Sequence, residues 1–192
     1  VAGIAIAHVA SFARLSYFQF ASYDNGSSFY DLARYDQAAW NTIHGRLLMF
    51  TDSDGHTGRT MCRLGTHVDL IHVFFSLFYL LHSSPVTLLT LQSLVIGLAT
   101  WPLYRFTKIV SDSDTMAFAV CLAFLMHPGI QQGNLAQFHA VCAAPLCLFA
   151  LFYTLEAKRW RAFWILLALT LICKENLALT TCAVGIWLFM KG

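Results

Sequence analysis

The sequence predicts an all-α integral membrane protein, a polytopic helical bundle with one long helical loop on the outer side. Composition is the first observation behind this prediction. Hydrophobic residues make up 58% of the 192 residues, charged residues make up 11%, and the mean hydropathy is +0.61. Soluble domains carry about one quarter charged residues, so a soluble domain of this length could not bury so much apolar surface.

Recurring apolar stretches, close to the ~20 residues that cross a bilayer, are the second observation. They lie at 1–20, 85–106, 115–130, 140–155, 162–173 and 177–190. We expect one transmembrane domain over 1–192, with a first span at 1–22, an external loop at 23–83 and about four further spans in 84–192. Because the sequence starts without Met and stops as a span ends, we expect an N-terminal fragment of a longer protein.

The Lys and Arg residues predict which loops face the cytoplasm. Outside the long polar loop they cluster at three places, all cytoplasmic by the positive-inside rule. These are Arg105 with Lys108, Lys158 with Arg159 and Arg161, and Lys191. The loops 131–139 and 174–176 then face outside, together with 23–66.

Residues 68–81 are apolar but too few for a normal span. We expect a re-entrant or juxtamembrane helix on the outer side. The alternative, a further span, stays open and would move Arg105 and Lys108 to the outside.

An amphipathic helix lying on the outer leaflet is predicted within the external loop. Its apolar residues recur at helical spacing at Leu32, Tyr35, Ala39 and Ile43. Gly45 is a suitable C-terminal stop.

Two carboxylates of this helix are candidates for catalysis. Asp31 lies where the helix begins, which fits an N-cap that pairs with Arg34, a carboxylate facing a reaction site, or both. Asp36 follows five residues later, about 140° round the helix, so the two do not share a face. Only the tertiary fold could bring both to one substrate.

Polar side chains break into apolar sequence at three further places on the predicted outer side. They are His67 with Asp69, His139, and Lys174 with Glu175. Because polar groups cost free energy in apolar surroundings, we interpret them, with the two carboxylates, as facing one external cavity. The structural alternatives are an interfacial histidine at position 67 and a solvated hairpin at 174–176.

With these residues in hand, the chain resembles a predicted bacterial membrane-protein family, domain of unknown function 2079 (DUF2079). That family's pattern has a Tyr-Asp-Leu-Gly-x-Phe-Asp-Gln-Ala-x-Trp-Asn segment, a Gly-x-His-Phe helix, a Phe-His-Pro-Glu segment and a Lys-Glu-Asp turn. The corresponding segments here are 30–41, 65–68, 138–141 and 174–176. The chain departs from the pattern at Ala33, Val68, Ala140, Val141 and Asn176. The acidic group that follows the histidine in the family is therefore missing, which weakens an implied metal site.

The family is in turn similar to the C-type glycosyltransferases (GT-C), which take a sugar from a polyprenyl-phosphate carrier. This resemblance implies a GT-C-like fold in the bacterial inner membrane, with the lipid-linked sugar donor and membrane lipid as partners. Asp31 would be the general base and Asp36 a second carboxylate. The resemblance implies substrate-binding roles for Arg34, His67, His139, Lys174 and Glu175. Glu175 would orient Lys174 or join a metal site, which leaves a divalent cation open as a cofactor.

Two other functions stay open. A transporter or channel component would use Lys174, Glu175 and His139 to line a pathway, although no internal repeat is detectable. A non-catalytic relative would bind lipid or a partner. The net charge of +2 gives no basic stripe, so nothing indicates nucleic-acid binding.

Overall fold

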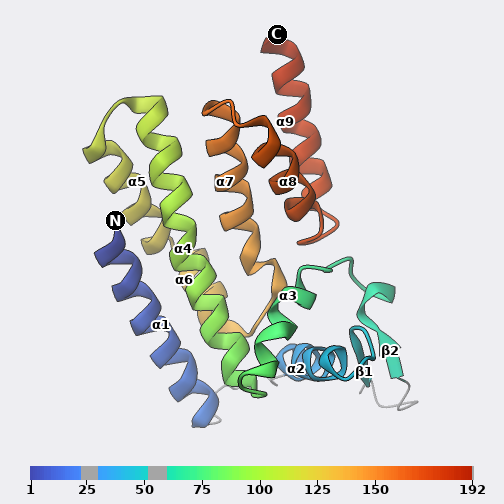
Figure 1. Cartoon of the computed structure of the whole chain (residues 1–192). Helices are drawn as coiled ribbons and strands as arrows, with labels where there is room; N and C mark the ends of the chain where they lie inside the picture. Colours follow the sequence, from blue (N-terminus) through green and yellow to red (C-terminus); the bar gives the residue numbers. More distant parts are fainter. Residues whose placement is uncertain (23–29, 52–59, 192) are drawn as a thin grey trace.

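The computed structural model describes residues 1–22, 30–51 and 60–191, and this part of the chain is mostly helical (Figure 1). A bundle of helices stands on a smaller layer formed by the external loop. The bundle helices are α1 (Ala2–Ala21), α4 (Pro85–Ser111), α5 (Asp114–Met126), α6 (Pro128–Ala136), α7 (Ala144–Glu156), α8 (Trp160–Leu171) and α9 (Leu177–Lys191). Helix α4 is central, because it packs against α1, α5 and α7.

The lower layer in Figure 1 contains one helix of 14 residues and several shorter elements. They are α2 (Tyr30–Ile43), β1 (Met49–Thr51), β2 (Thr60–Cys62), and the 3₁₀ turn η1 (Arg63–Gly65), followed by α3 (His72–Ser76) and the 3₁₀ turn η2 (Leu77–Leu80). Strands β1 and β2 pair antiparallel, with Phe50 opposite Met61. The purely helical prediction for this loop is therefore incomplete, because it missed the hairpin.

Helix α2 is the amphipathic helix that the sequence predicts. Its buried residues are Leu32, Tyr35, Ala38 and Ala39. After the helix ends, Gly45 has a φ of +80°, in the left-handed region that favours glycine. The side chains on the buried face join the core cluster with residues of α3 and α4, and α2 also packs against strand β1.

Residues 68–81 form no helix long enough to be a further span. The helical part is divided between α3 and η2, which together cover 72–80. Nine residues rise roughly 15 Å, about half of the ~30 Å hydrocarbon thickness. The segment lies in the lower layer, as a juxtamembrane element would.

Helix lengths support one membrane crossing among the described residues. By length and hydropathy only α4, with 27 residues, could span a bilayer. A single such helix is weak support, since a buried core helix passes the same test, and 61% of its most apolar part is buried. Helix α1 has 20 residues, and α5, α7, α8 and α9 are shorter, from 12 residues in α8 to 15 in α9. The predicted series of spans therefore goes beyond what these lengths establish.

Prolines divide two of the predicted spans. The expected span 115–130 is broken, because α5 ends at Met126 and Pro128 opens α6. The expected span 140–155 begins with η3 (Ala140–Ala143), and Pro145 lies in the first turn of α7. Proline is tolerated in a first helical turn, where its missing N–H would have no partner within the helix.

The chain reverses so that the polar loops and the basic loops lie toward opposite ends. The end of α4 with Arg105 and Lys108, and the turn between α7 and α8, lie at the upper end of Figure 1. Helix α2 and the loop 137–139 lie toward the lower end. The turn between α8 and α9 meets the segment before α3, where the Ile71 N–H donates to the Ile172 carbonyl oxygen at 3.0 Å.

A buried aromatic cluster joins the lower layer to the bundle. The fully buried Phe138 ring meets Tyr35 and Phe75 edge-on, with ring centroids 5.0 and 5.2 Å apart. His72 packs beside it at 5.7 Å. Since His139 is the next residue, this packing fixes where its side chain emerges.

Candidate functional site

The candidate site is a group of charged side chains around His139. Four of them are close enough for their charges to act on its imidazole: Asp31, Lys174, Arg63 and His67. They come from α2, the α8–α9 turn, η1 and the segment before α3. The structure thus brings together four of the residues that the sequence singled out, and adds Arg63. We call these five residues the His139 cluster.

Burial and neighbouring cationic groups lower the pKa of His139. Burial lowers the pKa of His139, the carboxylate of Asp31 opposes that effect, and the cationic Lys174 and Arg63 add to it, as does His67. A neutral imidazole at this position can accept or donate one hydrogen bond. An anion that binds beside it would raise its pKa.

Asp31 carries an unengaged carboxylate in this cluster. Its side chain is half-buried and has no hydrogen bond or ion pair with the described part of the chain. The N–H groups of Asp31 and Leu32 both donate to Oε1 of Gln137, at 2.9 and 3.0 Å. The start of α2 is therefore capped by Gln137, and Asp31 lies within the first helical turn. The N-cap interpretation of Asp31 is wrong, which leaves its carboxylate available.

Lys174 is the cation of the cluster that has no acidic partner among the described residues. Its neighbour Glu175 does not orient it. Glu175 instead accepts from the Val68 N–H at 3.0 Å and lies 3.0 Å from Nδ1 of His67. A hydrogen bond from its own backbone amide, then that to His67, lowers the pKa of Glu175 to about 2. Glu175 therefore ties the α8–α9 turn to the external loop and leaves Lys174 free.

The buried ion pair between Arg63 and Asp69 was missed by sequence reasoning. Nη2 of Arg63 lies 2.6 Å from Oδ2 of Asp69, and the side chains are 5% and 3% exposed. The Tyr35 hydroxyl donates to the same carboxylate at 3.0 Å, and its ring lies 3.7 Å beneath the guanidinium. In sequence Arg63 looks like one more solvated charge of a polar loop. Asp69, which we read with His67 as facing a cavity, is instead a buried partner.

Gln92 of α4 holds the backbone that carries His139. Its Oε1 accepts from the His139 N–H at 3.0 Å. Its Nε2 contacts the carbonyl oxygens of Gly133, Asn134 and Gln137 at 3.1–3.2 Å. One buried amide thus fixes both His139 and the residue that caps α2.

An apolar groove of about 220 Å³ opens beside His139. Its lining comes from α4, α6, η3 and the start of α7, and includes Ile96, Ile130, Val141, Cys142 and Pro145. His139 belongs both to the charged cluster and to this groove. A ligand with an ionic head group and an apolar chain could therefore place its head at the His139 cluster and its chain in the adjoining groove.

Asp36 and Arg34 do not join the His139 cluster. The Tyr79 hydroxyl donates to Oδ1 of Asp36 at 2.5 Å. Burial raises the pKa of Asp36, and the bond from Tyr79 partly offsets this. The guanidinium of Arg34 lies 3.8 Å from the Tyr30 ring and 5.4 Å from the Phe50 ring. The catalytic role of Asp36 and the substrate-binding role of Arg34 stay predictions.

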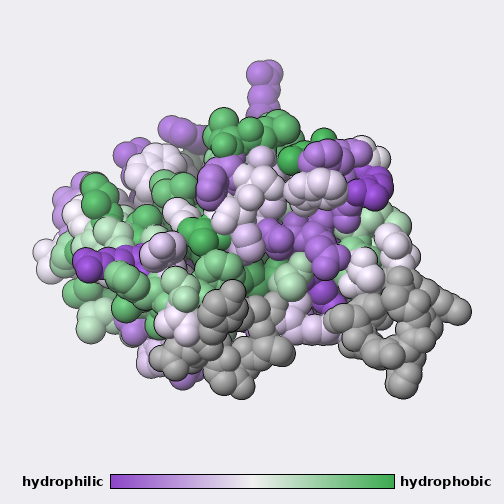
Figure 2. All heavy atoms as spheres, turned by 90° about the horizontal axis from the view of Figure 1, so that it is seen from below, coloured by the Kyte–Doolittle hydropathy of each residue, from purple (hydrophilic) through white to green (hydrophobic). Residues whose placement is uncertain are grey.

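Seen from below, the molecule combines polar and apolar surface on the face that carries the lower layer. Figure 2 shows a band of hydrophilic side chains crossing this face, bordered by hydrophobic ones. Within the described ranges, no three His, Cys, Asp or Glu side chains lie together as metal ligands would.

Residues 23–192 match the family described as "Predicted membrane protein (DUF2079)". The chain belongs to this family. Every candidate site residue lies within the matched DUF2079 region, whereas α1 precedes it. No curated protein and no solved structure matches the chain. Membership confirms the DUF2079 resemblance and the assignment to a membrane, while the similarity to GT-C enzymes stays a prediction.

Proposed function

We propose that this chain forms the donor site of a multi-pass enzyme of the bacterial inner membrane. The enzyme transfers a sugar from a polyprenyl phosphate on the outer face. One observation carries the proposal: His139 stands between a cluster of ionic side chains and an apolar groove. A polyprenyl phosphate has the same two parts, an anionic head and an apolar chain.

The phosphate would bind at the His139 cluster, chiefly through Lys174. Arg63 is already neutralised by Asp69, and His67 faces Glu175. Lys174 is the cation there that no described carboxylate neutralises, so it contributes most to binding an anion. The first isoprene units would lie in the groove beside Val141 and Pro145.

The transfer step is an inverting displacement at the anomeric carbon of the donor sugar. Asp31 takes the proton from the acceptor hydroxyl, and the acceptor oxygen forms a bond to that carbon. The bond from carbon to phosphate oxygen breaks, and its electron pair leaves with the polyprenyl phosphate. The phosphate gains one negative charge, which Lys174 stabilises.

Binding and transfer are tested separately on the full chain reconstituted in lipid nanodiscs. Farnesyl phosphate, a short polyprenyl phosphate, serves as the binding probe in calorimetric titrations. Lys174→Gln should weaken its binding by about 10- to 100-fold, since a charged hydrogen bond contributes roughly 1.5–3 kcal/mol. Arg161→Gln, which removes an exposed cation near the α7–α8 turn, is the control and should bind as the wild type does.

Transfer is followed as release of polyprenyl phosphate from a panel of radiolabelled polyprenyl-phosphate sugars. Asp31→Asn should abolish release while leaving farnesyl phosphate binding unchanged. If Lys174→Gln and Arg161→Gln bind the probe equally well, the phosphate site is refuted. If the wild type binds lipid but consumes none of the donors, the non-catalytic lipid-binding function replaces the enzyme. Passage of intact donor across the bilayer of sealed proteoliposomes that contain the chain would instead indicate a transporter.

A further inference from the structure

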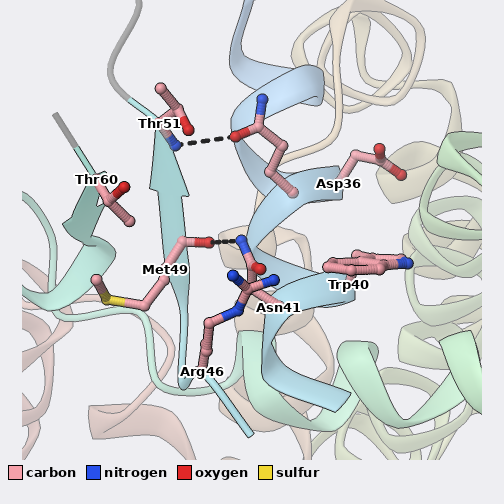
Figure 3. Close-up of a pocket in the computed structure, with 8 residues that line it drawn as sticks. Asp36, Trp40, Asn41, Arg46, Met49, Thr51 and Thr60 are labelled. Carbon is pink, nitrogen blue, oxygen red and sulfur yellow. Dashed lines mark hydrogen bonds between the residues drawn. The ribbon is translucent and has the colours of Figure 1, made fainter. Parts of the chain in front are cut away.

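A second cavity, of about 340 Å³, lies where α2 faces the β1–β2 hairpin. Its polar and aromatic lining includes Asp36, Gln37, Trp40, Asn41, Arg46 and Thr60 (Figure 3). None of the five residues of the His139 cluster lines it. Its volume is within the roughly 300–1,000 Å³ of small-molecule sites. We propose that this cavity binds a neutral saccharide.

The walls of the cavity are fixed by hydrogen bonds between α2 and strand β1. The Thr51 N–H donates to Oε1 of Gln37 at 2.9 Å, and Nδ2 of Asn41 donates to the Met49 carbonyl oxygen at 2.7 Å (Figure 3). These bonds use only one end of each amide. The NH₂ of Gln37 and the Oδ1 of Asn41 have no partner in the described ranges, so a donor and an acceptor remain for a ligand.

The charges that line the cavity balance. Asp36 supplies one carboxylate, whose Oδ1 is held by the Tyr79 hydroxyl while Oδ2 has no described partner. Arg46 supplies one exposed guanidinium, which lies 5.5 Å from the centroid of the Trp40 ring and has no described acidic partner. One negative and one positive group favour a neutral ligand whose groups both donate and accept. Sugar hydroxyls have that property. A phosphate would be repelled by the Asp36 carboxylate, and a metal ion would be repelled by the Arg46 guanidinium.

Trp40 adds the aromatic surface that a sugar ring needs. Its side chain is 42% exposed. The His44 ring stacks on it at 3.9 Å and 24°, which holds the indole in place. An exposed and fixed indole offers apolar area to the C–H face of a pyranose. The Arg46 guanidinium, which lies over the ring at 5.5 Å from its centroid, can bond the hydroxyls of the sugar.

This inference rests on the cavity alone and does not require the proposed transfer reaction. Asp36 and Asp31 lie about 140° apart around α2 and roughly 8 Å apart along it, so the two sites are separate. The role assigned here to Asp36 is binding, through hydrogen bonds to hydroxyls.

The test is saturation-transfer NMR and calorimetry on the full chain in nanodiscs. Methyl glycosides of glucose, mannose, galactose and N-acetylglucosamine are the probes. At least one should bind saturably, and Trp40→Ala or Arg46→Gln should weaken it about tenfold or more, the effect of losing one good contact. Both side chains are partly or fully exposed, so the variants should fold, which circular dichroism checks. Trp164→Ala, at an indole 63% exposed on α8, is the control.

Three results would overturn the proposal. The first is that no methyl glycoside binds the wild type saturably. The second is that Trp40→Ala and Trp164→Ala bind equally. The third is that glucose 6-phosphate binds while methyl glucoside does not, since the cavity would then select an anion. Lys174→Gln should leave sugar binding unchanged, so failure of the phosphate site and failure of this site are distinguishable.

Discussion

The buried ion pair between Arg63 and Asp69 should dominate the stability of the external layer. Replacing Asp69 by Leu leaves the Arg63 guanidinium buried without its counter-charge, which costs about 3–5 kcal/mol. The Tyr35 hydroxyl also loses its acceptor, at roughly 1 kcal/mol more. We expect Asp69→Leu to lower the free energy of unfolding by about 4–6 kcal/mol.

Two further variants separate charge from hydrogen bonding. Asp69→Asn keeps an oxygen that can accept from Arg63 and Tyr35, so it should cost less, about 1.5–3 kcal/mol. The double variant Arg63→Met with Asp69→Leu removes both charges and fills the space with apolar groups. It should recover most of the loss, because an apolar pair can replace a buried ion pair at little cost.

The assay is equilibrium denaturant unfolding of the full chain in detergent micelles, with hydrogen exchange at 63–72 as the local readout. The exposed pair of Lys108 and Asp114 provides a matched control, since its N–O distance is 2.7 Å against 2.6 Å for the buried pair. Asp114→Asn should have a far smaller effect, because water screens exposed charges. The reasoning is refuted if Asp69→Leu stays within about 1 kcal/mol of wild type, or if the double variant is no more stable than the single one.

Two further predictions concern buried polar groups. Gln92→Leu should destabilise the protein by about 3 kcal/mol or more and accelerate amide exchange over 133–139, because four hydrogen bonds to that segment are lost. His72 donates from Nε2 to the Tyr35 carbonyl oxygen, and burial lowers its pKa from 6.5 to about 4. The unfolded chain therefore takes up this proton first, so stability should fall by about 3 kcal/mol as the pH drops from 6.5 to 4. His72→Gln, which keeps a donor, should abolish that part of the pH dependence in unfolding titrations.

The sequence predicted best those features that local pattern decides. Helix α2 follows from apolar spacing and a glycine at its end, and the structure confirms it. The break at Pro128 was missed, because the apolar sequence continues across this position while helix α5 ends before it. The hairpin was missed because each strand has three residues, too few for an alternating pattern.

In the site too, the sequence predicted some features, while others depend on contacts between distant residues. Charge topology predicted that Asp31, His67, His139 and Lys174 face one side, and in the structure the charges of the other three act on the pKa of His139. Their partners could not be predicted in this way. Nothing local indicates that Glu175 bonds Val68, or that Gln137 caps α2, since each contact joins residues more than a hundred positions apart.

These partners determine what the His139 cluster can bind. Asp69 pairs with Arg63 and Glu175 bonds His67, so Asp31 and Lys174 are the two charged members without a bonded partner among the described residues. Burial and the three positive neighbours hold the pKa of His139 down, and a bound phosphate would act in the opposite direction. Phosphate binding would therefore be linked to proton uptake, and its affinity would rise as the pH falls from the pKa of His139 in the complex toward its lower pKa in the free protein. Proton uptake would turn His139 into a second cation, beside Lys174, that stabilises the leaving phosphate where the apolar groove begins.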